Sequence, residues 1–133
     1  MKIKLVNHSC ILLGTPEIKI ICDPWIEGRV FDNGWDFIVP SSIEYADFAN
    51  ITHIWFSHEH PDHFFPPNLM KIEEAHRKNI VVLFQKFVSL PLSGGHGSDS
   101  KWYCQRHSST AFWKDITTST GVLFGRAQRR FDV

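Results

Sequence analysis

The stretch HIWFSHEHPDH, residues 53–63, is the most informative part of this sequence of 133 residues. Its first half, residues 53–57, is short, apolar and rich in aromatic side chains, which predicts a buried β-strand. Its second half, residues 58–63, holds three histidines and an aspartate. A rigid strand that ends in a short polar loop can bring several donor side chains to one point. We therefore expect a metal-binding loop directly after a buried strand.

The spacing within this loop separates its donors into two pairs. His58 and His60 are two residues apart, so both imidazoles can point to one side of an extended backbone. Pro61 bends the chain, which lets Asp62 and His63 point elsewhere. Nitrogen and carboxylate donors in this arrangement suit one or two zinc ions, with manganese or iron as the alternatives. A run of solvated histidines is the competing interpretation, and the buried strand that precedes the loop disfavours it.

Strand patterns also occur before the loop. Residues 2–7 alternate between polar and apolar side chains, which predicts a half-buried strand. Residues 9–13 and 18–22 predict a hairpin around a turn at residues 14–17. The following residues 26–50 show no such periodicity. Because long ordered loops in compact domains are usually functional or packed by their own side chains, we expect this loop to flank the site.

A helix and a further strand are predicted after the loop. Residues 66–79 begin with two prolines and place Leu69 and Ile72 at helical spacing, which predicts one helix that ends near Asn79. Residues 80–84 are continuously apolar and predict a buried strand. A helix between two buried strands favours a parallel pair, so this strand should lie beside residues 53–57.

The composition limits the classes of partner. Hydrophobic residues make up 43% and charged residues 21% of the chain, which is typical of a soluble globular domain. The formal net charge of +0 predicts no nucleic-acid partner. No apolar run approaches the roughly 20 residues of a membrane span, so no membrane partner is expected. Three cysteines argue against a disulfide framework. We expect a cytoplasmic protein that acts on a small-molecule substrate.

Several segments resemble a known family. The sequence HEHPDH at residues 58–63 matches the H-x-H-x-D-H signature of the metallo-β-lactamase superfamily. The segments NHSC at residues 7–10 and IICDPW at residues 20–25 look like those of its L-ascorbate-6-phosphate-lactonase-like branch. The segments FDNGW at residues 31–35 and SHEHPDHF at residues 57–64 are similar to the metal domain of CMP-N-acetylneuraminate hydroxylase.

The resemblance implies an α/β fold, the metallo-β-lactamase-like αββα sandwich, which is built from two related halves. It covers roughly residues 1–90, which would form the N-terminal half of the domain. Residues 91–133 would form a poorly defined C-terminal segment, because their hydrophobic periodicity is lost. The sandwich would then be present as its first half only, or truncated. One face of its sheet would stay open, and a homo-oligomer or a partner chain would cover that face.

The resemblance also implies roles for the loop residues. His58 and His60 would bind a first metal ion, and Asp62 and His63 would bind a second. Asp62 would be the catalytic residue, because it also orients a metal-bound water that attacks the substrate.

Two residues outside the loop would support it. Asp23 would hold the metal loop through hydrogen bonds, and an ordinary turn aspartate is the alternative interpretation. His8 would lie near the mouth of the site, and a structural histidine at the end of a strand is equally consistent with the sequence.

The ligands that the family takes from its second half are hard to find here. His107 is the preferred candidate for the third histidine, with His96 as the alternative. Asp99 and Asp115 are the candidates for a bridging carboxylate by default.

These features lead to three functional hypotheses. The first is a metal-dependent hydrolase that attacks a lactone, ester or phosphoester with metal-activated water. The second is a truncated, non-catalytic remnant or fragment that needs a partner to complete its site. The third is a metal domain in sugar-nucleotide or surface-glycan metabolism. None of the cysteines shows the C-x-H pairing, so the sequence contains no complete Rieske motif and oxygenase chemistry by this chain alone is not expected.

Overall fold

The computed structural model describes residues 1–91, 98–107 and 112–113, and the backbone alone for residues 85–91 and 98–107. Its centre is one mixed sheet of six strands in the order β1-β2-β3-β4-β5-β6. The strands are β1 (Lys2–Leu5), β2 (Ile11–Gly14), β3 (Lys19–Cys22), β4 (His53–Phe56), β5 (Val81–Pro91) and β6 (Ser98–His107). The helices are the 3-10 helix η1 (Tyr45–Asn50), α1 (Pro66–Lys71) and α2 (Glu74–Arg77).

The strand pairing follows the local sequence patterns. The strands β1, β2 and β3 form an antiparallel meander, which confirms the predicted hairpin. The strand β4 pairs in parallel with both β3 and β5, which confirms the predicted parallel pair on either side of a helical connection. Because parallel strands end at the same edge of a sheet, the turn after β3 and the loop after β4 lie side by side.

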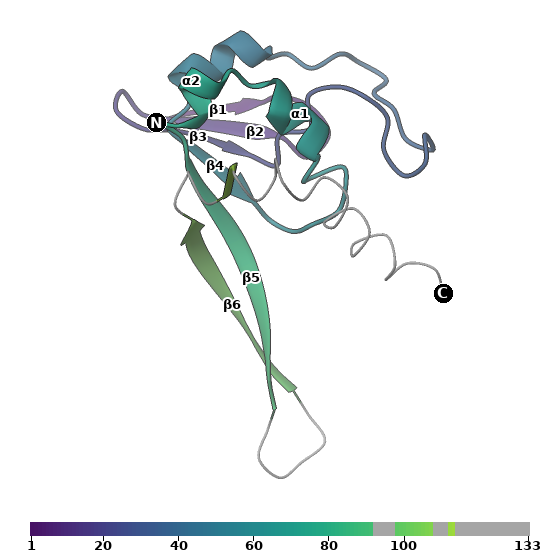
Figure 1. The fold of residues 1–133 in the computed structure, drawn as a ribbon, viewed down its shortest axis with the longest axis vertical. Helices are drawn as coiled ribbons and strands as arrows, with labels where there is room; N and C mark the ends of the chain where they lie inside the picture. Colours follow the sequence, from purple (N-terminus) through teal and green to yellow (C-terminus); the bar gives the residue numbers. More distant parts are fainter. Residues whose placement is uncertain (92–97, 108–111, 114–133) are drawn as a thin grey trace.

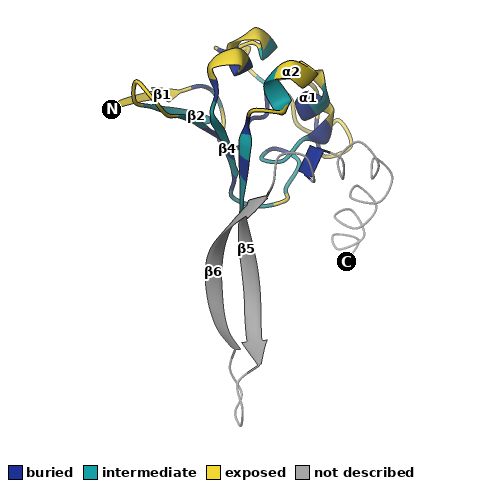
Figure 2. Ribbon diagram, turned by 60° about the vertical axis from the view of Figure 1, so that its left-hand side comes forward, coloured by how far each residue is buried: buried dark blue, intermediate teal, exposed yellow. Residues whose placement is uncertain are grey.

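The core lies between one face of the sheet and α1. Ile21, Ile54 and Val82 are register partners across β3, β4 and β5, and all three are fully buried. Leu69 and Ile72 pack against the same core and are also buried. Figure 2 shows this buried layer under α1 and α2. Each fully buried aliphatic side chain of this size contributes about 1.5–3 kcal/mol, so this row firmly anchors the strands that carry the site.

The other face of the sheet stays open along its β1 edge. Ile3 is 65% exposed and Leu5 is 72% exposed. Ile3, Leu13 and Ile20 are register partners on this face, and none of them is buried. Figure 2 shows β1 as exposed and β2 as only half-buried. The described residues therefore leave an apolar strip uncovered.

The predicted single helix over residues 66–79 is wrong in its length. The backbone is extended at Ile72 and Glu73, so α1 ends at Lys71 and a separate short helix, α2, follows. Leu69 and Ile72 reach the core, but α2 contributes no buried residue. A longer helix would have gained no apolar burial from its last turns, and burial is what stabilises most helices in proteins.

The predicted αββα sandwich, whether present as its first half or truncated, is also wrong. A sandwich needs two sheets packed face to face with helices outside both. The described residues form one small mixed sheet with few and short helices, which lie on one side of it (Figure 1). The strands β5 and β6 continue as a long antiparallel hairpin that extends away from the rest of the sheet (Figure 1). This part of the chain therefore adds length to one sheet and does not start a second.

The predicted division between residues 1–90 and 91–133 stays a prediction. Its boundary falls at the end of β5, and the two strands of the hairpin lie on either side of it. Within the described ranges, none of the helices has both the length and the apolar character needed to cross a membrane.

Candidate metal site

The site forms where β3 and β4 end at the same edge of the sheet. Asp23 directly follows β3, and its backbone N–H donates to the carbonyl of Trp55 at 2.9 Å. Its φ is 46°, in the left-handed region that aspartate and asparagine tolerate better than most residues. This backbone turns the chain away from the sheet and leaves the carboxylate beside the start of the loop at Ser57.

Both carboxylate oxygens of Asp23 are used. The backbone N–H of Ser57 donates to Oδ1 at 2.8 Å, and the hydroxyl of Ser57 donates to Oδ2 at 2.7 Å. The Nδ1 atom of His63 lies 3.0 Å from the same Oδ2. Asp23 is buried. This geometry agrees with the predicted role of Asp23 in holding the loop, whereas metal binding by the loop stays a prediction.

Asp62 and His63 lie close to His8, which is distant from them in the sequence. The Oδ2 atom of Asp62 lies 2.9 Å from Nε2 of His8 and 3.3 Å from Nε2 of His63. The hydroxyl of Ser9 donates to the backbone carbonyl of Asp62 at 3.0 Å. One donor atom from each of His8, Asp62 and His63 lies within 4.8 Å of the other two. This is the arrangement that a single metal ion requires.

The second oxygen of Asp62 is unusual. Asp62 is buried, yet its Oδ1 has no hydrogen-bond partner among the residues that the structure describes. Buried polar atoms are nearly always paired, because leaving one unpaired costs about 1–3 kcal/mol. A cation beside this carboxylate would remove that cost.

His58 and His60 are in contact with one another. Nε2 of His58 lies 2.8 Å from Nδ1 of His60, and Nδ1 of His58 lies 2.8 Å from the hydroxyl of Ser57. Burial, followed by the nearby His63 and His60, lowers the pKa of His58. A neutral imidazole is the form that binds a metal ion. The two histidines thus stay candidate ligands, beside the group of His8, Asp62 and His63.

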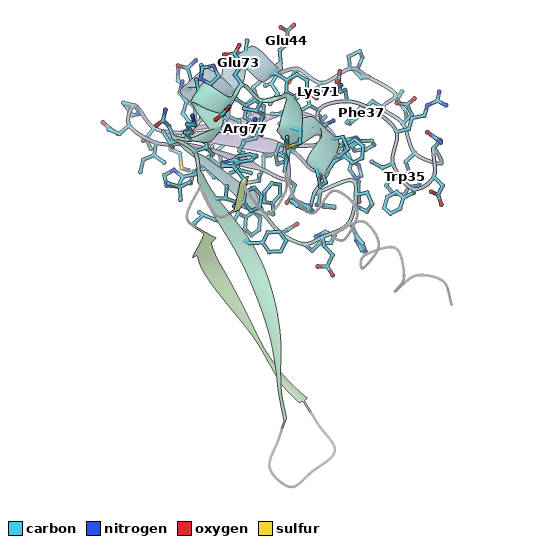
Figure 3. The ribbon with its side chains drawn as sticks, viewed as in Figure 1. Trp35, Phe37, Glu44, Lys71, Glu73 and Arg77 are labelled. Atoms are coloured by element: carbon cyan, nitrogen blue, oxygen red, sulfur yellow. The ribbon has the colours of Figure 1, made fainter. Side chains whose placement is uncertain are left out.

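Aromatic rings surround His8. Trp25 and Trp35 contact its ring edge-on, with centroids 6.0 and 5.7 Å away. Trp25 is buried and packs on Phe37, as expected for loop packing, whereas Trp35 is 49% exposed. In the view of Figure 3, Trp35 and Phe37 lie on the right, away from Arg77 of α2. The loop of residues 26–50 therefore flanks the site, where Trp35 contacts His8.

One buried polar residue that holds this loop, Asn68 in α1, was not expected from the sequence. Its Oδ1 accepts hydrogen bonds from the backbone N–H groups of Ile26 and Glu27 at 2.5 and 3.0 Å, and its Nδ2 donates to the carbonyl of Glu27 at 2.8 Å. An asparagine inside a helical pattern is a weak signal, because this residue competes with the helix backbone for hydrogen bonds.

The expected ligands from the second half stay predictions. His107 ends β6, where its backbone is opposite Val82, and its side chain lies outside the described part of the structure. The side chain of Asp99 also lies outside that part, as do His96 and Asp115 altogether.

Comparison with known proteins gives the hydroxylase to which a similarity was expected, but not the expected metallo-β-lactamase superfamily. A protein of Mycobacterium tuberculosis (strain ATCC 25618 / H37Rv), named as a Rieske 2Fe-2S iron-sulfur protein, is 32% identical over 88 residues, which are 65% of this chain and 16% of the relative. A similarly named protein of Mycolicibacterium smegmatis is 28% identical over 87 residues, again 65% of this chain and 16% of the relative. The cytidine monophosphate-N-acetylneuraminic acid hydroxylase of Sus scrofa is 32% identical over 69 residues, which are 51% of this chain and 16% of the hydroxylase.

The matches cover only a small part of each relative. The chain spans less than a fifth of the length of the curated relatives that it matches. No family model matches the chain, and no solved structure matches it.

These relatives overturn three expectations. The chain resembles Rieske iron-sulfur proteins and a hydroxylase, and not the metallo-β-lactamase superfamily or its lactonase-like branch. The expected hydrolase is wrong for the same reason, because an iron-sulfur protein serves electron transfer and a hydroxylase is a redox enzyme. Zinc is wrong as the expected cofactor, since it does not change its redox state and the relatives are named for iron.

The side chains of the described residues do not fit a Rieske cluster. Such a cluster takes two cysteine thiolates and two histidines. Cys10 and Cys22 are buried, and burial is the main cause that raises the pKa of Cys10 to about 12 and that of Cys22 to about 11. Thiols in such surroundings stay protonated, whereas cluster ligands are thiolates. Cys104 lies in β6, where the backbone alone is described.

Proposed function

We propose that this chain is the iron-binding part of a Rieske-type oxygenase, in which one iron ion is held at the loop of residues 57–63. The electrons would come from a 2Fe-2S cluster held by another part of such a protein or by a partner. Asp62 carries this proposal, because its buried Oδ1 has no partner among the described residues and its Oδ2 lies 3.3 Å from Nε2 of His63. The partial similarity to Rieske iron-sulfur proteins and to a hydroxylase supports the choice of iron.

The donor set fits iron. Imidazole and carboxylate together bind iron in non-haem oxygenases, and such sites keep coordination positions open for other ligands. Asp62 and His63 are the central candidates, and His58, His60 and His107 stay candidate ligands. When bound, the iron would supply one-electron redox chemistry and a place for oxygen to bind.

The residues of this chain have three tasks in the proposal. Asp62 provides a negative charge in a buried position, where its attraction for a cation is only weakly screened. Oδ2 of Asp23 accepts a hydrogen bond from Nδ1–H of His63, which holds the ring so that Nε2 faces Asp62. The exposed ring of Trp35 stands beside the site, where a small-molecule substrate would approach.

The open sheet face is the second part of the proposal. We propose that a further copy of the chain or a partner chain covers the exposed Ile3 and Leu5, because monomeric proteins rarely leave such apolar strips in water. Light scattering after size-exclusion chromatography tests the homo-oligomer, and a monomer at all concentrations would contradict a second copy of the chain as the cover. We also place the protein in the cytoplasm, which the free thiols of Cys10 and Cys22 support. The expected absence of nucleic-acid and membrane partners stays a prediction.

The iron site is tested by metal content and redox behaviour. The full chain is purified without chelators, loaded with ferrous iron under nitrogen and desalted, and its metals are measured by plasma mass spectrometry. Wild-type protein should retain iron, which dithionite reduces and oxygen reoxidises, as followed by electron paramagnetic resonance. Asp62→Asn should lose the iron, whereas Asp36→Asn, an equivalent change of an exposed aspartate paired with Arg29, should keep it.

Two outcomes would contradict this proposal. One is a wild-type chain that retains no iron. The other is an Asp62→Asn variant that retains as much iron as the wild type.

A further inference from the structure

We infer that His8 is a direct ligand of the iron, so that His8, Asp62 and His63 form a centre of two histidines and one carboxylate. This inference rests on the proposed function and names the protein ligands of its site. From the sequence, His8 was expected only at the mouth of the site. The structure brings it against Asp62 across a sequence separation of 54 residues.

The distances suit a shared ion. Oδ2 of Asp62 lies 2.9 Å from Nε2 of His8 and 3.3 Å from Nε2 of His63. With bonds of about 2.0–2.2 Å, two ligand atoms on one metal ion lie about 3.0–3.5 Å apart. Small movements of the side chains would therefore admit an ion among these three atoms.

The unpaired oxygen of Asp62 is an independent sign of a ligand. The side chain of Asp62 is only 8% exposed, and its Oδ1 has no partner in the described part of the chain. The contacts with His8 and His63 involve Oδ2 alone. A histidine that served only to neutralise Asp62 would leave the cost of the unpaired oxygen in place.

His63 has the hydrogen bond that metal-binding histidines usually have. Such a histidine donates from its second ring nitrogen to a carboxylate or carbonyl, which fixes the ring. Nδ1 of His63 lies 3.0 Å from Oδ2 of Asp23, which leaves Nε2 on the side of Asp62 and His8.

The ring of His8 is held and yet accessible. Trp25 and Trp35 contact it from two sides, and the hydroxyl of the neighbouring Ser9 donates to the backbone of Asp62. The side chain of His8 remains 41% exposed. A ligand in this position leaves one side of the ion open to solvent, which a site for oxygen and substrate requires.

His58 and His60 are the competing ligands. Their rings are joined by a contact of 2.8 Å, and the other nitrogen of His58 is 2.8 Å from the hydroxyl of Ser57. Binding by these two rings would have to break their mutual contact. His8 and His63 already have their Nε2 atoms directed at one carboxylate oxygen.

The test counts imidazoles on the metal and measures affinity. The full chain is loaded with one equivalent of copper(II), and pulsed electron paramagnetic resonance reports how many histidine rings are bound. Wild-type protein should show two imidazoles, and His8→Ala should show one. In parallel, cobalt(II) titrations followed by visible absorption should show that His8→Ala weakens binding by more than about 100-fold, beyond the usual effect of losing an outer hydrogen-bonding partner.

A conservative variant separates a ligand from a positioning residue. Glutamine at this position, in His8→Gln, can still hydrogen-bond to Asp62 but is a poor metal ligand. If His8 is a ligand, His8→Gln should bind as weakly as His8→Ala. If His8 only positions Asp62, His8→Gln should restore binding, and the inference is overturned. His76→Ala, which removes a histidine paired with Glu73, serves as the control and should retain two imidazoles.

Different experimental outcomes would contradict this inference and the proposed function. If wild-type protein binds neither iron nor cobalt, both fail. If His8→Ala keeps two imidazoles and full affinity while His63→Ala loses them, the iron site stands and His8 is not a ligand. Loss of an imidazole in His60→Ala but not in His8→Ala would assign the second histidine to His60.

Discussion

Two turns at the same edge of the sheet each hold a buried aspartate, and the two aspartates differ in one respect. The side chain of Asp23, after β3, is 7% exposed, and that of Asp62, in the loop after β4, is 8% exposed. Both oxygens of Asp23 have hydrogen-bond partners, including two from Ser57. Asp62 has one oxygen near two histidines and one oxygen without a partner in the described structure.

This difference in hydrogen bonding indicates that the carboxylate of Asp23 is structural and that the carboxylate of Asp62 binds a ligand. Equal burial puts the same desolvation cost on both side chains. The hydrogen bonds of Asp23 offset that cost within the fold, so removing Asp23 should unfold the loop. The desolvation cost of Asp62 is only partly offset by its contacts, so removing its charge should affect metal binding more than the stability of the fold.

Replacement of Asp23 should give the largest loss of stability. Asp23→Ala leaves the N–H of Ser57 unpaired and places alanine at a positive φ, so the free energy of unfolding should fall by about 3 kcal/mol or more. Urea unfolding of the metal-free protein, followed by tryptophan fluorescence, measures this change. Asp23→Asn keeps an acceptor and tolerates the backbone, so it should lose less. Equal losses in the two variants would mean that the carboxylate charge alone matters.

Replacement of Asn68 should give the second-largest loss of stability. Its side chain is uncharged, and both of its polar atoms have hydrogen-bond partners. Asn68→Ala leaves the N–H groups of Ile26 and Glu27 unpaired, which should cost about 2 kcal/mol in the same unfolding measurement. Asn79→Ala, which removes only an exposed hydrogen bond to the carbonyl of Ala75, is the matched control and should cost less than about 0.5 kcal/mol. Similar losses of stability in the two variants would show that the buried hydrogen bonds of Asn68 contribute no more than the exposed one of Asn79.

Replacement of Asp62 should have a smaller effect on folding. Asp62→Asn removes a buried charge whose Oδ1 has no partner in the described part of the molecule, so the stability of the metal-free protein should change by less than about 1 kcal/mol. Iron binding should be lost in the same variant. A loss of stability as large as that of Asp23→Ala would break the comparison between the two aspartates.

The ion pair of Lys71 and Glu27 at the surface should give the smallest effect. Both side chains are about half exposed, so Lys71→Ala should change stability by less than about 0.5 kcal/mol, and less in high salt. The hydrogen bond from Lys71 lowers the pKa of Glu27 from its ordinary value of 4.5. The small contribution should therefore be present above that value and disappear as the pH falls through the lowered pKa. Unfolding measured at neutral and acidic pH checks this, and a pH-independent difference would contradict it.

Much of the local structure could be predicted from the sequence, because alternation and apolar runs act over a few residues. The meander of β1, β2 and β3 and the parallel strand β5 follow from such patterns. The break at Ile72 could not be predicted, because it depends on which helix residues reach the core. The family and the cofactor could not be predicted correctly, because short segments such as residues 58–63 fix neither the arrangement of the sheet nor the identity of the metal.

By itself, the sequence determined that a buried strand leads into a loop with three histidines and an aspartate. Local spacing decides such features, since neighbouring residues are held near one another by the chain. Three features depend on the folded chain: His8 contacts Asp62, Asp23 and Ser57 hold the loop, and one oxygen of Asp62 has no partner in the described part of the chain. These contacts join residues far apart in the chain, and packing of the strands brings them within hydrogen-bonding distance.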